Sequence, residues 1–225
     1  MIPIRPTPRL LAALMVCLLA IGLWQLGEGS WIYAKARLAQ WLLMRAWSRT
    51  LAGEVAPKPW PWADTWPVAR LTVPSKQVDL IVLNGAYARI LAFGPGYWEG
   101  SPLSDSIGTT ILTGHRDTHF AFLKTLRTGD HIMLQTRTGH PRSYRVRDLQ
   151  VVDFRTAILW FNPDDNALIL VTCYPFDRLI PGGPLRYVVI AEAVYNGNER
   201  HDGRHQAQSA RDLDAKRAFN YSHGN

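Results

Sequence analysis

The chain has 225 residues, 47% of them hydrophobic, which is enough for one ordinary domain core together with additional segments. Its formal charge is +7, from 25 Lys and Arg against 18 Asp and Glu, which favours contact with anionic surfaces such as membrane lipid. The cations do not form one stripe with interleaved aromatic platforms, so no nucleic-acid partner is expected.

The first predicted element is an apolar segment at residues 10–26, LLAALMVCLLAIGLWQL, which follows Arg5 and Arg9. As a helix it would span about 26 Å, near the short limit for crossing a bilayer. A secretory signal peptide has the same order, but no small-x-small cleavage site follows directly. We therefore expect an uncleaved transmembrane anchor at residues 10–27 after a cytoplasmic N-terminus at residues 1–9. The charge of the flanking segments does not fix its orientation.

The next segment, residues 28–67, is predicted to connect the anchor to a folded domain. Residues 31–51 contain good helix formers, three tryptophans and dispersed cations, which favours a helix at the membrane surface. In residues 54–67, EVAPKPWPWADTWP, prolines alternate with tryptophans, so an extended, semi-rigid stalk is expected.

From residue 68 the pattern changes to short β-branched runs separated by glycine and proline. Seven such runs occur up to residue 196, with short helical turns expected at residues 87–93 and 120–126. This spacing is typical of a β-barrel or β-sandwich domain. The tail at residues 197–225 has few large apolar groups and is expected to be disordered.

The run LILVTCYPF, residues 168–176, ends in a cysteine where the chain leaves the predicted sheet. A lone cysteine on an apolar strand is more often an inert small hydrophobe than a nucleophile. The only other cysteine, Cys17, lies in the apolar anchor, so no disulfide is expected inside the folded domain. Cys173 could act as a nucleophile only if a base or a positive charge lowers the pKa of its thiol.

Two residues at other strand ends could activate that thiol. His115 follows the run TTILTG, and Arg186 opens the run LRYVVI. The thiolate would attack a peptide carbonyl, the imidazolium would protonate the departing amine, and the guanidinium would stabilise the oxyanion or position the substrate. His119 could pair with His115 on zinc, but zinc usually takes three or four protein ligands and no CxxC or HExxH occurs. We therefore expect no metal and no other cofactor.

Three motifs resemble those of the sortase family. TGHRDT at residues 113–118 resembles the catalytic histidine motif, ILVTC at 169–173 resembles TLXTC with isoleucine in place of threonine, and PLRYVV at 184–189 resembles the segment that holds the catalytic arginine. The resemblance covers about residues 68–195.

The resemblance implies a fold that is mainly β, a closed sortase-type barrel of about eight strands with short helices, preceded by the transmembrane helix. It also implies Cys173 as nucleophile, His115 as general acid and base, and Arg186 as the clamp for substrate and oxyanion. Thr172 would line the substrate groove beside the thiol.

The implied activity is that of a membrane-anchored cysteine transpeptidase. Such an enzyme cleaves an LPXTG-like C-terminal sorting signal of a protein substrate through a cysteine thioester. It then transfers the product to an amine acceptor, for which peptidoglycan is one candidate. Two alternatives stay open: a cysteine protease that hydrolyses the same acyl-enzyme, and a non-catalytic membrane-tethered binding module.

The YPF that follows Cys173 and the Trp-rich anchor region most resemble the class GN sortases of proteobacteria. This resemblance implies a single-pass protein of the bacterial inner membrane with its catalytic domain on the periplasmic side.

Overall fold

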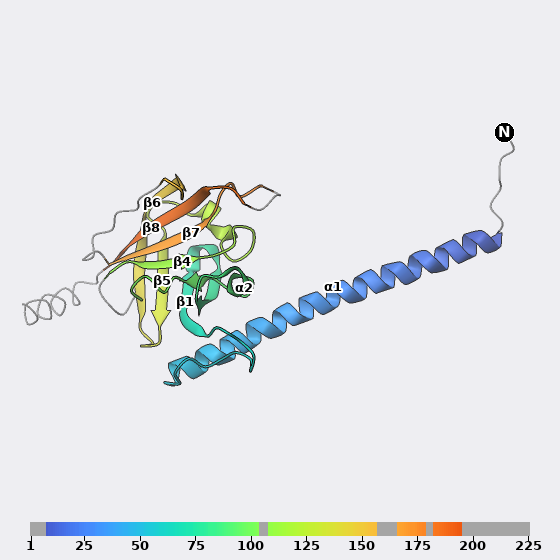
Figure 1. Cartoon of the computed structure of the whole chain (residues 1–225), viewed down its shortest axis with the longest axis horizontal. Coiled ribbons are helices and arrows are strands. Elements are labelled where there is room, and N and C mark those ends of the chain that lie inside the picture. The colour runs from blue at the N-terminus through green and yellow to red at the C-terminus, as the bar shows by residue number, and fades with distance from the viewer. Residues whose placement is uncertain (1–7, 104–107, 157–165, 179–181, 195–225) are drawn as a thin grey trace, which may run out of the picture.

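The computed structural model describes residues 8–103, 108–156, 166–178 and 182–194. The segments predicted for residues 1–7 and 197–225 therefore lie outside the described residues. Figure 1 shows a long helix, α1 (Pro8–Leu51), whose C-terminal end packs against a β-barrel. The other short helical elements are η1 (Pro74–Lys76), α2 (Ala88–Leu91) and η2 (Ala121–Thr125).

Eight strands close into a barrel in the order β1-β2-β3-β4-β7-β8-β6-β5. They are β1 (Pro67–Val73), β2 (Val78–Asn84), β3 (Gly96–Tyr97), β4 (Thr110–Thr113), β5 (His131–Thr136), β6 (Pro141–Asp153), β7 (Ala167–Cys173) and β8 (Leu185–Ala193). The predicted closed barrel with short helices is confirmed. The strand missing from the seven predicted runs is β3, which has two residues and is too short to show an alternating pattern.

The strands β7 and β8 are apolar on both faces. Leu168 and Leu170 of β7 belong to the barrel core, where they pack with Val189 and Ala191 of β8. Because successive side chains in a strand point to opposite faces, Ile169 lies on the outer face, where it packs with Val188 and Ile190. This explains why the sequence of β7 is a continuous apolar run and not an alternating one.

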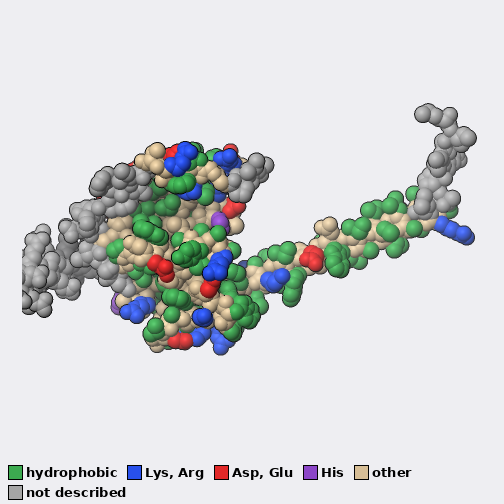
Figure 2. All heavy atoms as spheres, in the orientation of Figure 1, with side chains coloured by type: hydrophobic (Ala, Val, Ile, Leu, Met, Phe, Trp, Pro, Cys, Tyr) green, Lys and Arg blue, Asp and Glu red, His purple; other side chains and the backbone are tan. Residues whose placement is uncertain are grey.

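The helix α1 runs without a break for 44 residues, about 66 Å at the rise of an α-helix. Among the described residues it is the helix that is long and apolar enough to cross a membrane, and Figure 2 shows hydrophobic side chains along most of its free part. The anchor and the juxtamembrane helix predicted from the sequence are thus two parts of one helix.

The C-terminal quarter of α1 packs on the barrel through a narrow apolar face. Leu43, Ala46 and Trp47 are buried there, and Leu43 and Trp47 contact a cluster that includes Ile81 and Leu83 of β2. Buried positions three and four residues apart make one stripe along a helix. This stripe is narrow, because among the described residues of α1 only Leu43, Ala46, Trp47 and Thr50 are buried.

The Pro/Trp-rich segment differs from the extended stalk that the sequence predicted. It turns back beside the end of α1, where Arg49 Nη1 donates a hydrogen bond to the Lys58 carbonyl at 3.3 Å and the Trp60 ring lies 5.0 Å from that of Phe93. Thr65 Oγ1 then donates to the Asn84 carbonyl at 2.7 Å. Proline prevents helix and sheet in this segment, but it does not prevent packing.

Replacing Leu43 with alanine should weaken the packing of α1 on the barrel by about 2–5 kcal/mol, because Leu43 is fully buried. The neighbouring Met44→Ala variant is the control, since Met44 is exposed on the same turn. Limited proteolysis of the full chain in detergent micelles should cut residues 53–62 faster in Leu43→Ala than in Met44→Ala. Equal rates would contradict the packing.

Candidate active site

Three strands bring their ends together at one end of the barrel. The strands β4 and β7 are parallel, with Thr113 opposite Val171, so their C-terminal ends coincide. The strand β8 is antiparallel to β7 and begins at this same end, with Arg186 opposite Cys173. Of the three sequence-predicted residues, Cys173 and Arg186 lie on adjacent strands, and His115 follows β4 by two residues.

Cys173 and Arg186 are direct cross-strand partners. Side chains of such partners lie on the same face of the sheet, with Cβ atoms about 5 Å apart. Because Thr172 points into the barrel, Cys173 points to the outer face, where it is half-buried and free of any disulfide. An arginine placed beside the thiol in this way can direct N–H donors toward a group bound at the sulfur.

His115 follows a glycine that is fixed to β7 by two hydrogen bonds. The Gly114 N–H donates to the Val171 carbonyl at 3.2 Å, and Thr172 Oγ1 donates to the Gly114 carbonyl at 2.7 Å. The last paired residues of β4 and β7 are Thr113 and Val171, and His115 and Cys173 each follow two residues later along their own segments. The two hydrogen bonds at Gly114 therefore hold the start of the histidine loop beside the strand that carries the thiol.

Residue 114 must be glycine because the ring of Phe120 packs against its Cα atom. A Cβ atom on Gly114 would lie 2.7 Å from the ring of Phe120, closer than side-chain atoms approach. The N–H of Phe120 donates to the His115 carbonyl at 2.9 Å and closes the turn. The glycine in TGHRDT is therefore a packing requirement of the histidine loop.

The structure gives Thr172 a different contact from the one expected. The resemblance implied that Thr172 lines a substrate groove, but its side chain is only 2% exposed and its hydroxyl is bonded to the Gly114 carbonyl. The hydroxyl of Thr172 thereby connects the histidine loop to the strand that carries the cysteine.

Three contacts hold the Arg186 side chain. Its Nη1 donates to the carbonyls of Gly183 and Leu185 at 2.8 and 2.9 Å, and its guanidinium carbon lies 4.5 Å from the centre of the Phe154 ring. The nearby Asp153 carboxylate is bonded to Arg155. That bond is the main reason why the pKa of Asp153 is lowered, and the positive charge of Arg186 lowers it further.

Phe154 is a site residue that the sequence did not reveal. It follows β6 directly and lies beside Arg186 because Val152 of β6 is the cross-strand partner of Arg186. A cation over an aromatic face is attracted by about 0.5–1 kcal/mol at an exposed position. The only sequence signal was an aromatic residue at the end of a strand, and this does not identify its partner.

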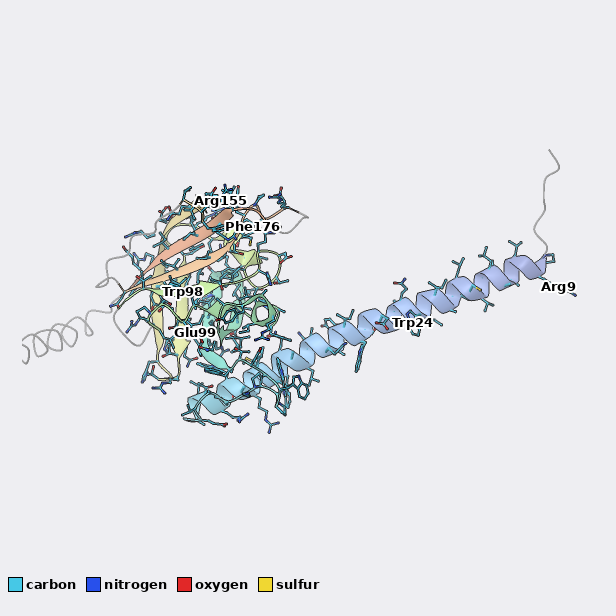
Figure 3. All side chains as sticks on the ribbon, in the orientation of Figure 1. Arg9, Trp24, Trp98, Glu99, Arg155 and Phe176 are labelled. Carbon is cyan, nitrogen blue, oxygen red and sulfur yellow. The ribbon has the colours of Figure 1, made fainter. Side chains whose placement is uncertain are left out.

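An aromatic cluster supports the chain directly after Cys173. Tyr174 stacks on Tyr187 with ring centres 6.3 Å apart, and Phe176 meets the edge of Tyr187 at 5.1 Å. Burial, and secondarily the neighbouring Tyr174, raises the pKa of Tyr187, so this phenol is neutral. Figure 3 shows Phe176 and Arg155 at the same end of the barrel.

His119 links the histidine loop to the segment after α2. Its Nε2 lies 3.5 Å from the Ala92 carbonyl. Burial is the main cause that lowers the pKa of His119, while the Ala92 bond opposes it and the charge of His115 adds to it. Within the described ranges, no group of three or more His, Cys, Asp or Glu side chains gathers that could hold a metal ion.

The sortase domain matches residues 71–194, which is more than half of the chain. The chain belongs to the sortase family.

Among individual relatives, Sortase D of Bacillus subtilis is 32% identical over 125 residues, which are 55% of this chain and 62% of that protein. The chain therefore spans about three fifths of the length of this relative. Sortase A from Corynebacterium diphtheriae is similar in structure, with a TM-score of 0.53 and 25% identity over 60% of this chain and 64% of the other. The Sortase D5 transpeptidase of Clostridium perfringens has a TM-score of 0.57 over 71% and 99%, and at 19% identity it supports the fold alone.

Replacing Thr172 with valine should lower the free energy of unfolding by about 1–3 kcal/mol, because the buried Gly114 carbonyl loses its hydroxyl donor. The matched Thr172→Ser variant keeps the hydroxyl and should lose less. Urea denaturation measures the stability, and hydrogen exchange at the Gly114 amide should accelerate in the valine variant only. Equal exchange in both variants would contradict a positioning role for the hydroxyl.

Proposed function

We propose that the protein is a membrane-anchored cysteine transpeptidase with Cys173 as nucleophile, His115 as general acid and base, and Arg186 as the clamp for substrate and oxyanion. The observation that carries this proposal is the register of β4, β7 and β8, which brings the three residues to one barrel end. The membership of the sortase family supports the same assignment.

The reaction would begin when the Cys173 thiolate attacks the carbonyl carbon of the scissile peptide bond. The negative charge that develops on the carbonyl oxygen would be met by N–H donors of Arg186. Nη1 is used for the Gly183 and Leu185 carbonyls, and the guanidinium carries further donors on Nε and Nη2.

The C–N bond would then break, with a proton passing from the His115 imidazolium to the departing amine, which leaves a thioester on Cys173. An incoming amine would give its proton back to His115 as it attacks the thioester. A new amide bond would form and the thiolate would be regenerated.

The outer face of the sheet beside Cys173 supports an extended peptide substrate. Val171 lies two residues before the thiol on the same face, and Ile111 of β4 packs beside it on Ile169 and Val188. Ile169 and Val188 are fully buried, so an extended peptide would contact the partly exposed Val171 and Ile111 and reach the thiol at its end. We propose this face as the floor of the substrate groove.

The finer assignment follows from the resemblance of the motifs. We propose an LPXTG-like C-terminal sorting signal on a protein substrate, an amine acceptor for which peptidoglycan is one candidate, and a place among the class GN sortases. The YPF that follows Cys173 and the Trp-rich anchor support that class. It would put the catalytic domain on the periplasmic side of the bacterial inner membrane.

In a fluorogenic assay with sorting-signal peptides, the full chain in detergent should cleave the peptide, and Cys173→Ala should reduce the rate by a factor of about 10³ or more. The chain supplies its own control, because Cys17→Ala removes the other thiol, which lies on the exposed part of α1. Cleavage that survives in Cys173→Ala would overturn the proposal.

Mass spectrometry of the products with an added amine distinguishes the alternatives. A product joined to the amine supports the transpeptidase. Hydrolysis alone would show a cysteine protease, and a Cys173 thiol no more reactive than a peptide thiol would show a binding module.

Replacing Phe154 with alanine should lower kcat/KM about 2- to 5-fold, because the ring no longer holds the Arg186 guanidinium in place. Phe154→Tyr keeps an aromatic face and should retain the rate, and Val151→Ala is a control at an exposed position of the same strand. An equal loss in the alanine and tyrosine variants would contradict this role of the aromatic ring.

A further inference from the structure

We propose that α1 is a rigid post that holds the catalytic end of the barrel at a fixed height above the bilayer. The enzyme would then cleave membrane-tethered chains only if a minimum spacer separates their cleavage site from the membrane. This inference rests on the proposed function. It adds that the substrates are membrane-tethered chains with a minimum spacer length.

The post is fixed to the barrel by packing and not by a flexible linker. Leu43 and Trp47 are 0% and 2% exposed, and they pack against Ile81 and Leu83 of β2 and against Ile90 of α2. Thr50, one turn further along, is also buried. Burying side chains of this size stabilises a contact by about 1.5–3 kcal/mol each, so the helix and the barrel move as one body.

The free part of the post begins where the apolar run ends. From Leu26 to Leu43 the helix rises about 26 Å. Lys35 lies over the Trp31 ring at 5.1 Å, and Arg37 lies over the Tyr33 ring at 5.7 Å. Aromatic rings and cations of this kind are enriched at the membrane–water interface, so they favour a position of the helix in which the apolar run ends at the bilayer surface.

The glycines near this boundary do not shorten the post. Gly27 and Gly29 each cost the helix about 1 kcal/mol relative to alanine, so any bend is expected there. Both lie directly after the apolar run. A bend at this point would tilt the post at the bilayer surface and leave the helix from Ser30 to Leu51 straight.

The catalytic end of the barrel lies on the side that faces the bilayer. Gln40 Nε2 of α1 donates to the Phe93 carbonyl at 2.9 Å, and the preceding Ala92 carbonyl meets His119 of the histidine loop. One short segment therefore separates the post from the loop of His115. Figure 1 shows α2 on the side of the barrel toward which the free, apolar part of α1 extends.

These distances set a minimum for the substrate. An extended chain covers about 3.3 Å per residue, so a height of up to about 26 Å corresponds to at most about eight residues of spacer. A longer spacer still reaches the thiol, and cleavage then declines slowly as the effective concentration falls. A flexible linker of the same length as the post would instead sample many heights and produce no threshold.

The test uses the full chain in liposomes with tethered sorting peptides whose spacers run from about two to about fourteen residues, a range that brackets the threshold. Seven helix-forming residues inserted between Ala36 and Arg37 should raise the barrel by about 10 Å and lengthen the shortest cleaved spacer by about three residues. Replacing residues 31–37 with a Gly/Ser sequence should abolish the threshold. A spacer threshold that stays unchanged in both variants would contradict the proposal that α1 sets the height of the catalytic end.

A soluble sorting peptide separates this inference from the proposed function, because its cleavage should be equal in all these variants. If the unaltered chain fails to cleave it, the proposed function fails, and the height is then tested without activity. A dye on Tyr87→Cys in a Cys17→Ala, Cys173→Ala background, with acceptor dyes on the lipid, reports the height of α2. Energy transfer should fall when the seven residues are inserted. Unchanged transfer would contradict the proposal that α1 sets the height of the barrel.

Discussion

The parallel pairing of β4 with β7 is the constraint on which the rest of the site depends. It makes two strands that are far apart in the sequence end at the same level, and Gly114 is then fixed to β7 by a hydrogen bond in each direction. The antiparallel strand β8 adds Arg186 opposite Cys173. A shift of one residue in either pairing would turn the thiol or the guanidinium to the other face of the sheet.

Whether a strand could be predicted from the sequence depended on its length. The seven longer strands were visible as apolar runs, whereas β3 was not, because two residues carry no periodicity. The connection between membrane helix and barrel was harder still. The Pro/Trp-rich residues suggested an extended spacer, and only the contacts of Trp60 and Thr65 show that this segment folds back.

The candidate site could also be predicted from the sequence only in part. Cys173, His115 and Arg186 could be selected because each lies at a strand end, and strand ends are a property of the sequence. Phe154 could not be selected, because its place over Arg186 depends on the register of β6 against β8. Thr172 was selected because it precedes the cysteine, and its buried hydroxyl has another role that only the contact with Gly114 reveals.

The packing of β2 on α1 has a consequence for the order in which the protein is made. The helix leaves the ribosome first, and the β1–β2 hairpin, the first part of the barrel to follow, finds the apolar face of Leu43 and Trp47 already formed. Closure of the barrel requires β1 to meet β5 much later in the chain. The apolar face of α1 can therefore cover one side of the β1–β2 hairpin while the later strands are still being synthesised.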